Sequence, residues 1–342
     1  MMSPMHHPRS SRVRIMDVAV EAGVSIGTVS NTLNHPERVT AETRERVMAA
    51  VQELGFVPNQ QARVLTGAPS RTIGLMVVDL ISPFFMEVAH AVEQAASEAG
   101  YVVILCNSEN LAERQDQRLK LLAAQRVVGA LLTPAGGGLP ETEATIGLPL
   151  VLIDYEGDEH PCSVVVDHIE GGRQAAKHLI DLGHTSLAFV GGLPELRQFE
   201  QRVIGMKRAM EEAGLDPVTL IELRSDGIGV ESGEVSATQL LKGSTLPTGI
   251  CCGNDMLAFG VYRRLTRSGV RVPDDMALVG YDDIDFAANW IVPLTSVRQP
   301  TREMGRLAAE LLLEHAGDGE HEHRRIVLKP ELVVRRSSGA LD

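Results

Sequence analysis

Apolar residues recur at helical spacing in two short stretches between residues 14 and 34. One face of the first stretch carries Val18, Ala19 and Ala22, and one face of the second carries Val29 and Leu33. This spacing predicts two amphipathic helices that pack against each other. Gly23 lies between them and suits a tight turn, and Ser25 can cap the second helix by accepting a backbone N–H. The stretch therefore predicts a helix-turn-helix unit or an ordinary pair of packed helices.

A third amphipathic pattern follows over residues 40–54. Thr40 can cap this helix, and Gly55 lies just past its end. Its apolar face is formed by Val47, Val51 and Leu54. These side chains can close a three-helix core with the two preceding helices. Residues 59–67 form a further helical pattern, capped by Asn59, that needs a partner because helix nucleation is costly in so short a segment.

The polar face of the second helix is the candidate for DNA contact. A helix-turn-helix presents the N-terminal residues of its second helix to base edges in the major groove. The residues on or beside this face are Ser25, Ile26, Gly27, Thr28, Ser30 and Asn31. Ile26 can pack on a thymine methyl group, Asn31 can pair with adenine or reach a phosphate, and Gly27 has no side chain with which to read a base. Direct readout is therefore expected to depend on Ile26 and Asn31.

From residue 71 onward, short apolar or β-branched runs alternate with helical patterns, which is typical of parallel sheets in α/β domains. The predicted strands lie within residues 72–80, 101–107, 129–134, 148–154, 186–192, 249–255 and 275–283. The predicted helices lie near residues 84–99, 110–125, 169–182, 200–213, 232–242, 255–268 and 301–315. The predicted fold class is an all-α head followed by an α/β domain.

Polar residues directly after the predicted strands are candidate ligand contacts, because ligands of open α/β sheets bind beyond the carboxyl ends of the strands. They are Asp79 with Ser82, Asn107, Asp154, Asp167, Asn254 with Asp255, and Asp282 with Asp283. Turn formation or helix capping explains such residues equally well, and Asp255 is expected to cap the helix that follows it. No GxGxxG motif opens a strand-to-helix turn, so a dinucleotide site is not predicted.

Length and charge refine this picture. The chain has 342 residues, of which 44% are hydrophobic, and this predicts two or three domains. The net charge is −13, yet residues 1–72 carry eight Lys and Arg against six Asp and Glu, a net +2, so the remainder carries −15. A near-neutral head predicts weak non-specific affinity for DNA. Operator binding would then depend on dimerisation, helix N-termini at phosphates and shape complementarity.

The sequence also predicts the cellular compartment of the protein and the redox state of its cysteines. It has neither a run of 18 apolar residues nor a signal-peptide pattern, which predicts a cytoplasmic protein without membrane contact. Residues 1–13 hold Pro, Ser and His without periodicity and predict a disordered lead. The cysteines Cys106, Cys162, Cys251 and Cys252 have no CxxC spacing and are expected to be reduced, structural thiols.

The runs DVAVEAGVSIGTVSNTLN and TRERVMAAVQELGFVPN, with the hinge segment and strand that follow, resemble the LacI/GalR family of bacterial transcriptional repressors. The resemblance runs from Arg14 to Arg336. Arg14 departs from the pattern, since the family usually has a threonine cap there, and Gly27 stands where a base-reading side chain often lies. The resemblance implies a DNA-binding domain over residues 14–58, a hinge helix and linker over 59–70, and an effector-binding and dimerisation domain over 71–342.

The resemblance also implies a role for the hinge. In this family the segment becomes helical when two subunits bind the operator, and a leucine then wedges into the minor groove at the centre of the site. Leu65 matches that leucine, and an apolar wedge can kink DNA by unstacking a base step. The implied DNA contacts of the hinge are Asn59, Ala62, Arg63 and Leu65.

The second block resembles the family's periplasmic-binding-protein-like effector domain, in which two parallel-sheet subdomains clasp a small molecule. The chain is expected to cross between them near Val166, Arg298 and Ile326. This gives one subdomain of about 71–166 and 299–326, and a second of about 167–298 and 327–340. The implied effector contacts are Phe85, Arg202, Asn254, Asp282 and Trp290, to which the strand-end rule adds Asp154. An arginine fork with Asp and Asn suits the vicinal hydroxyls of a sugar.

The predicted function is allosteric repression of a carbohydrate-utilisation operon by a homodimer bound to near-palindromic double-stranded DNA. A dimer is favoured over a tetramer because no heptad-patterned tail follows. A purine or nucleoside corepressor, or control by a protein partner, is the alternative. The residues leave open whether the effector releases or strengthens DNA binding.

Other classes of function fit less well. Catalysis and a bound cofactor are not expected, because the sequence has neither a nucleophile elbow nor a metal-spaced histidine pair on one helix. No metal site is predicted: His315, His321 and His323 lie among Gly, Asp and Glu and look like a solvated surface loop. A secreted sugar-binding protein would need a signal peptide and would lack residues 14–67.

Overall fold

The structure is a computed structural model that describes residues 13–57, 70–136, 138–139, 147–155, 162–193, 195–317 and 321–339. Contacts divide the chain into two compact units, residues 1–70 and 71–342. The predicted disordered lead falls almost wholly outside the described residues, and so do the hinge candidates Asn59, Ala62, Arg63 and Leu65. Among the described helices, none is both long enough and apolar enough to span a bilayer.

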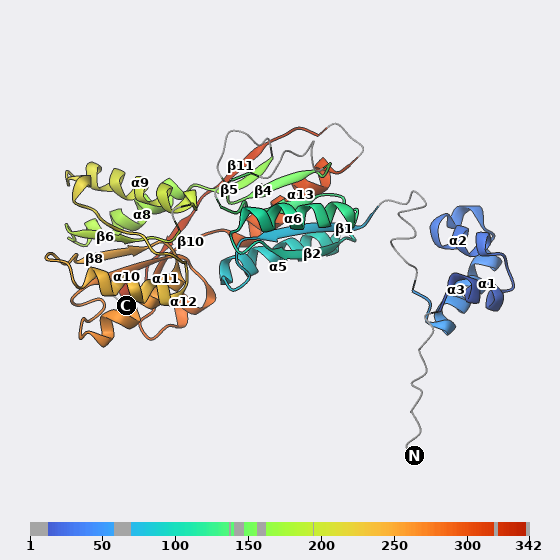
Figure 1. Ribbon diagram of the computed structural model, residues 1–342, viewed down its shortest axis with the longest axis horizontal. Helices are drawn as coiled ribbons and strands as arrows, with labels where there is room; N and C mark the ends of the chain where they lie inside the picture. The colour runs from blue at the N-terminus through green and yellow to red at the C-terminus, as the bar shows by residue number, and fades with distance from the viewer. Residues whose placement is uncertain are drawn as a thin grey trace, which may run out of the picture. The chain divides into compact units, whose positions relative to one another are not determined.

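The described part of the first unit, residues 13–57, contains three α-helices and one 3₁₀ turn (Figure 1). They are α1 (Ile15–Ala22), α2 (Ile26–Asn34), η1 (Pro36–Arg38) and α3 (Ala41–Leu54). Gly23 ends α1 with a φ of 63°, a left-handed conformation that favours glycine. Ser25 caps α2 by accepting from the backbone N–H of Thr28 at 3.1 Å. The predicted turn and cap are both present, so α2 leaves α1 at a tight, fixed corner.

A small apolar core holds the three helices together. Its buried members are Val18, Ala19, Ala22, Val29, Val47 and Ala50, and Leu33, Val51 and Leu54 pack around them. Arg46 of α3 adds a polar contact by donating from Nη2 to the carbonyl oxygen of Ala22 at 3.0 Å. Asp17 supplies the reciprocal contact of a capping box at the start of α1, because its carboxylate accepts from the backbone N–H of Arg14 at 2.8 Å.

The second unit contains two six-stranded sheets. Sheet A has the order β11-β5-β4-β3-β1-β2 and is parallel throughout; its strands are β1 (Thr72–Val77), β2 (Val102–Asn107), β3 (Ala130–Leu132), β4 (Leu150–Ile153), β5 (Ser163–Val166) and β11 (Arg325–Leu328). Sheet B has the order β12-β10-β9-β8-β6-β7; its strands are β6 (Leu187–Val190), β7 (Ile221–Leu223), β8 (Gly249–Cys252), β9 (Ala277–Asp282), β10 (Thr295–Arg298) and β12 (Glu331–Val333). Only β12 is antiparallel among these pairings.

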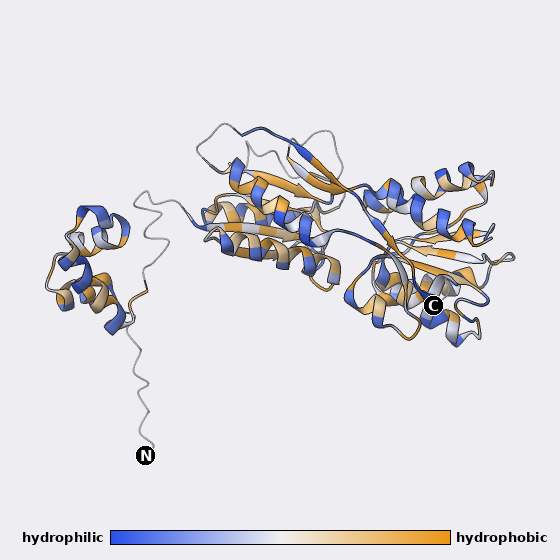
Figure 2. Ribbon diagram, turned by 180° about the vertical axis from the view of Figure 1, so that it is seen from behind, coloured by the Kyte–Doolittle hydropathy of each residue, from blue (hydrophilic) through white to orange (hydrophobic). Residues whose placement is uncertain are grey.

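Helices cover both faces of each sheet, and the strands between them are apolar (Figure 2). On sheet A, α5 (Pro83–Glu98) and α13 (Thr301–His315) share one core, and α6 (Ala112–Ala124) covers the other face. On sheet B, α8 (His168–Asp181) and α9 (Arg197–Glu212) cover one face, and α10 (Val230–Leu240) and α11 (Asp255–Arg267) cover the other. Short segments α12 (Asp285–Asn289), η2 (Pro217–Thr219) and η3 (Arg336–Ser338) complete the unit.

The chain passes between the two sheets three times. It leaves sheet A after β5, returns through residues 299–300 between β10 and α13, and leaves again after β11. The third crossing lies a few residues later than predicted, because Ile326 and Leu328 still pair with β5 at Val164 and Val166. The sequence pattern also missed five short strands, namely β5, β7, β10, β11 and β12.

Candidate functional site

Helix α2 presents the face that was predicted to contact DNA. Ser25, Ile26, Gly27 and Asn31 are exposed, with Ile26 at 48%, while Thr28 and Ser30 are half-buried. Val29 and Thr32 point into the core instead. Ser25 and Thr28 join through their hydroxyls at 2.9 Å, and Asn34 donates to Ser30 at 3.3 Å. The described part of this surface therefore carries one apolar and one amide side chain, Ile26 and Asn31, free to approach bases.

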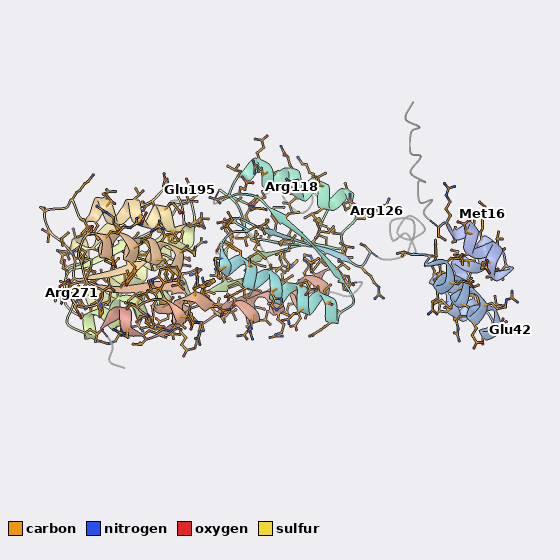
Figure 3. All side chains as sticks on the ribbon, turned by 90° about the horizontal axis from the view of Figure 1, so that it is seen from below. Met16, Glu42, Arg118, Arg126, Glu195 and Arg271 are labelled. Carbon is orange, nitrogen blue, oxygen red and sulfur yellow. The ribbon has the colours of Figure 1, made fainter. Side chains whose placement is uncertain are left out.

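The second unit has a cavity where the carboxyl ends of the strands of sheets A and B meet. Its volume is about 30 Å³, and it opens to solvent. Both subdomains line it, with Ser82, Phe84, Phe85, Asp154, Leu196, Gln198, Phe199, Arg202, Ile228, Asn254, Asp282 and Gln299. Glu195, labelled in Figure 3 near the junction of the two subdomains, lines the neighbouring hollow with Asp154 and Tyr155. Five of the six predicted effector contacts thus come together in one cavity.

Arg202 lies at the base of this cavity and is only 3% exposed. Its guanidinium stacks on the ring of Tyr281, with Cζ 3.6 Å from the ring centroid. Nη1 donates to the carbonyl oxygen of Gly253, and Nε and Nη2 lie 3.4 and 3.3 Å from Nδ1 of His168. These contacts use one N–H on each of its three nitrogens, which leaves one N–H on Nη1 and one on Nη2 for a ligand.

A buried hydrogen bond joins the two subdomains beside Arg202. His168, the first residue of α8, lies with Nε2 2.7 Å from Oδ1 of Asp154, which follows β4. Burial and the nearby guanidinium lower the pKa of His168, so its neutral ring donates from Nε2 and accepts from Arg202 at Nδ1. Burial opposes ionisation of Asp154, but His168 and Arg202 outweigh it and hold its pKa below the ordinary value. Oδ2 of Asp154 is buried without a hydrogen-bond partner in the described chain.

Asp282 and Gln299 form the second polar group of the cavity. Gln299 Nε2 donates to Asp282 Oδ1 at 2.7 Å, and Gln299 Oε1 is buried without a partner among the described residues. Burial raises the pKa of Asp282 to about 7, although Arg202 and the bond from Gln299 both oppose the shift. The carboxyl can therefore donate or accept a hydrogen bond near neutral pH.

Asn254 caps α11, a role that was predicted for Asp255. Its Oδ1 accepts from the backbone N–H of Leu257 at 2.8 Å, and its Nδ2 donates to the carbonyl oxygen of Ile228 at 3.0 Å. Asp255 is instead fully buried and accepts from Ser296 at 2.6 Å and from the N–H of Ile284 at 2.9 Å. Burial raises the pKa of Asp255 well above its ordinary value. Asn254 lines the cavity, but its side-chain oxygen and nitrogen are hydrogen-bonded to the backbone of Leu257 and Ile228.

Trp290 is the one predicted effector contact that lies away from the cavity. Its ring stacks on Phe259 at 4.2 Å and lies edge-on to Tyr262 in the core on the α11 face of sheet B. Among the strand-end candidates, Asp167 caps α8, and Asp283 is held by Arg298 and Arg335. Asp79 and Asn107 accept backbone N–H groups two residues on, as turn residues do.

Several cavity residues were not predicted from the sequence. They are Phe84, Leu196, Gln198, Phe199, Ile228 and Gln299, with His168 and Tyr281 behind them. Gln299 lies in the second crossing and His168 directly follows the first. A polar residue at a predicted crossing could therefore have identified Gln299 and His168 as candidate cavity residues. The apolar lining gave none, because Leu and Ile inside helical or loop patterns are ordinary core residues.

Known proteins share both parts of this arrangement. Residues 14–59 match the lacI family of bacterial regulatory proteins, and residues 176–338 match a periplasmic binding protein-like domain. The HTH-type transcriptional repressor PurR of Photobacterium profundum is 38% identical over 328 residues, covering 94% of this chain and 98% of the relative. PurR of Aliivibrio salmonicida is 36% identical over 329 residues, with coverage of 94% and 98%.

Two solved structures are similar over nearly the whole chain. The lac repressor dimer bound to operator and the anti-inducer ONPF has a TM-score of 0.85 at 30% identity, covering 96% of this chain and all of that one. The complex of the transcriptional regulator CelR with cellobiose has a TM-score of 0.70 at 31% identity, with coverage of 95% and 100%.

A helix-turn-helix head followed by a two-subdomain ligand cleft defines an effector-responsive, DNA-binding transcriptional repressor. The chain belongs to the lacI family of bacterial regulatory proteins. This confirms the resemblance inferred from the sequence and the predicted fold class. The family is non-enzymatic, in agreement with the expectation from the sequence motifs.

Proposed function

We propose that this repressor binds a purine base or nucleoside as corepressor, and that a homodimer in the cytoplasm then binds a near-palindromic operator. The first support is the similarity of the PurR repressors, at 36 to 38% identity over almost the full chain. This ligand class was the alternative to a sugar in the analysis of the sequence. The chemistry of the cavity supports it independently.

The apolar lining of the cavity suits a flat ring. Phe84, Phe85 and Phe199 are each at most 8% exposed and border the cavity together with Leu196 and Ile228. Phe84 and Phe85 meet edge to face, with centroids 5.0 Å apart. Aromatic and aliphatic walls favour a planar heterocycle, since its faces gain stacking and apolar contact.

The polar groups of the cavity suit the edge of such a ring. Gln299 Oε1 is a buried acceptor without a partner in the described chain, and Asp282 lies beside it with a pKa near 7. Purines carry ring N–H groups and exocyclic amines in the ring plane that can satisfy these acceptors. An unsatisfied buried acceptor costs about 1–3 kcal/mol, so a matching donor contributes strongly to affinity.

The sugar alternative keeps some support from the cellobiose complex of the similar regulator CelR. A sugar would need several donors and acceptors aimed at its hydroxyls. Arg202 and Asn254, which were predicted to supply them, already bind Gly253, His168, Ile228 and Leu257. These contacts leave two of the five N–H groups of Arg202 for a sugar, so the preference for a base depends on the apolar walls and on Gln299.

Isothermal titration of the full-length protein tests the ligand class. We expect guanine, hypoxanthine or their nucleosides to bind, and cellobiose, glucose and ribose to give no heat. Gln299→Ala should weaken purine binding about tenfold, because it removes a buried acceptor. Gln117→Ala, on the exposed face of α6, is the matched control and should bind like the wild type. Binding of a sugar with no purine binding would overturn the proposal.

A further inference from the structure

Four potential metal ligands from three elements meet at one point in the subdomain of sheet A. Cys162 directly precedes β5, His315 ends α13, and His321 and His323 precede β11. One donor atom from each residue lies within 4.8 Å of the donor atoms of the other three. Sγ of Cys162 lies 3.0 Å from Nε2 of His321 and 3.0 Å from Nδ1 of His323. The histidine tract is therefore more than the solvated loop predicted from its composition.

The three imidazole rings surround the thiol. His315 and His321 stack at 4.5 Å with an interplanar angle of 12°, and His323 stands nearly perpendicular to both at 5.1 and 5.0 Å. Cys162 is fully buried, and His315 and His321 are half-buried. Imidazole nitrogens and a cysteine sulfur are donors that transition-metal ions such as Zn²⁺ bind.

The donor set indicates which ions fit. One thiolate and three imidazoles suit a borderline-soft divalent ion such as Zn²⁺, which binds sulfur and nitrogen in tetrahedral geometry. With Zn–S and Zn–N bonds of about 2.3 and 2.0 Å, two ligand atoms of a tetrahedral site lie about 3.3–3.6 Å from each other. The present separations, all within 4.8 Å, reach those values through small side-chain rotations. Four protein ligands close the coordination sphere, which is typical of a structural or regulatory ion rather than a catalytic one.

We propose that Cys162, His315, His321 and His323 form a binding site for a zinc-like transition-metal ion. The site is separate from the effector cavity. Cys162 lies at the amino end of β5, whereas Asp154 of the cavity lies beyond the carboxyl end of β4, the parallel neighbour of β5. The two sites therefore lie at opposite ends of the parallel strands of sheet A.

The ion would link three elements, each of which adjoins one of the three crossings. β5 runs into the first crossing, α13 begins at the second, and β11 runs into the third. A bound ion would tie these elements together at the ends remote from the crossings. Since the ion binds the folded site and not the unfolded chain, it would stabilise this subdomain in proportion to its occupancy.

Cobalt titration of the full-length protein tests the site directly. The protein is treated with a chelator, kept reduced with a phosphine, and titrated with Co²⁺. We expect one equivalent per chain to produce a thiolate-to-cobalt charge-transfer band and strong tetrahedral d–d bands, both removed by Zn²⁺. The charge-transfer band excludes binding by histidines elsewhere in the chain, because it requires a thiolate ligand.

Two variants and two controls locate the site. Cys162→Ser should abolish the charge-transfer band, and His323→Ala, at the exposed ligand, should weaken cobalt binding at least tenfold while preserving the circular dichroism spectrum. Cys106→Ser and His35→Ala remove the same residue types elsewhere and should titrate like the wild type. Absence of the band in the wild type, a charge-transfer band in Cys162→Ser, or wild-type cobalt affinity in His323→Ala would overturn the proposal. Zn²⁺ should also raise the Tm of the wild type and leave that of His323→Ala unchanged.

Discussion

At the cavity, Asp154 and Asp282 adopt backbone conformations that residues with a Cβ atom rarely occupy. Their φ values are 53° and 108°. Such conformations cost about 1–3 kcal/mol each and persist where the surrounding structure holds them, commonly at functional sites. Both residues are also nearly buried, and both carboxylates face the ligand cavity. Backbone strain and burial thus coincide at two of the carboxylates that the strand-end rule selected.

Burial of Asp282 predicts a pH-dependent stability. Its folded pKa of about 7 lies above the ordinary value of about 3.9. The folded state therefore keeps a proton that the unfolded state loses, and stability falls as the pH rises from about 4 to about 7. Asp282→Asn cannot ionise and can still accept from Gln299. Relative to the wild type, it should gain about 4 kcal/mol at pH 8 and little at pH 4, because each unit of pKa difference corresponds to about 1.4 kcal/mol.

Thermal unfolding of the full-length wild type and Asp282→Asn at pH 4 and pH 8 measures this difference. An equal stability difference at both pH values would show that Asp282 does not titrate in this range.

The bond between His168 and Asp154 predicts a second stability effect. His168→Ala would leave the buried Asp154 carboxylate without its 2.7 Å partner, and should lower the free energy of unfolding by about 3 kcal/mol. Tyr281→Phe is the matched control, because it removes a hydroxyl 3.2 Å from His168 but keeps the ring under Arg202. Urea unfolding should give a loss below about 1 kcal/mol for this control. Similar losses in the two variants would contradict the assignment.

Residue by residue, the sequence identified the carboxylates that lie at strand ends, but not which of them face the cavity. Asp255 and Asp283 have the same sequence setting as Asp154 and Asp282. They are satisfied internally by Ser296 and Arg335, which lie 41 and 52 residues further along the chain. Only the tertiary fold brings such partners together, so local pattern could not separate the two pairs.

At the level of elements, helices α8 and α9 pack with their backbones in close approach. A Cβ atom on Gly205 would lie 1.9 Å from the carbonyl oxygen of Ile169 and 2.7 Å from the backbone nitrogen of Arg173. Both neighbours are backbone atoms, which cannot move aside as a side chain can. This contact positions Arg202, one turn before Gly205, at the base of the cavity.

Gly205→Ala should therefore destabilise the effector domain by about 2–3 kcal/mol, since overpacking at a helix contact forces the helices apart. It should also weaken effector binding through Arg202. Glu211→Ala, at an exposed position of the same helix, is the control and should change stability by less than about 0.5 kcal/mol. Unfolding in urea checks both, and wild-type stability in Gly205→Ala would contradict the close packing of α8 and α9.

In helix α2, the glycine Gly27 gives a prediction for the DNA-binding head. A Cβ atom on Gly27 would meet only Ser25 Oγ, at an ordinary 3.7 Å. Gly27→Ala should stabilise the head by about 1 kcal/mol, because alanine favours a helix more than glycine does. If the bare backbone at Gly27 faces the bases, the added methyl group should lower operator affinity. Unchanged affinity in an anisotropy titration would show that Gly27 lies outside the interface.

The helices of the second unit and seven of its strands were predictable, and five short strands were not. All seven helices predicted in the second unit are present, as α5, α6, α8, α9, α10, α11 and α13. The missed strands have three or four residues each, as do β3, β4, β6 and β8, which were predicted because they lie within longer apolar runs of the sequence. Three of the missed strands, β7, β11 and β12, lie at sheet edges, where exposed positions weaken the apolar signal further.

Over the whole effector domain, control depends on how the two subdomains are joined. Three crossings connect them, and the backbone N–H of Asp167 in the first donates to the carbonyl oxygen of Leu328 beside the third at 2.9 Å. His168 adds its bond to Asp154, and Gln299 joins the second crossing to Asp282. A ligand that contacts Asp282 and Gln299 thus acts on the connections themselves.

Operator binding with and without purine tests the central claim. The DNA is a near-palindromic site recovered from the organism's genome by selection with the purified protein, and fluorescence anisotropy at physiological salt reports its affinity. A saturating purine that binds by calorimetry should tighten operator binding at least about tenfold, a coupling within the usual range of about 1–3 kcal/mol. Operator affinity that is unchanged or weaker when the purine is bound would contradict corepressor control.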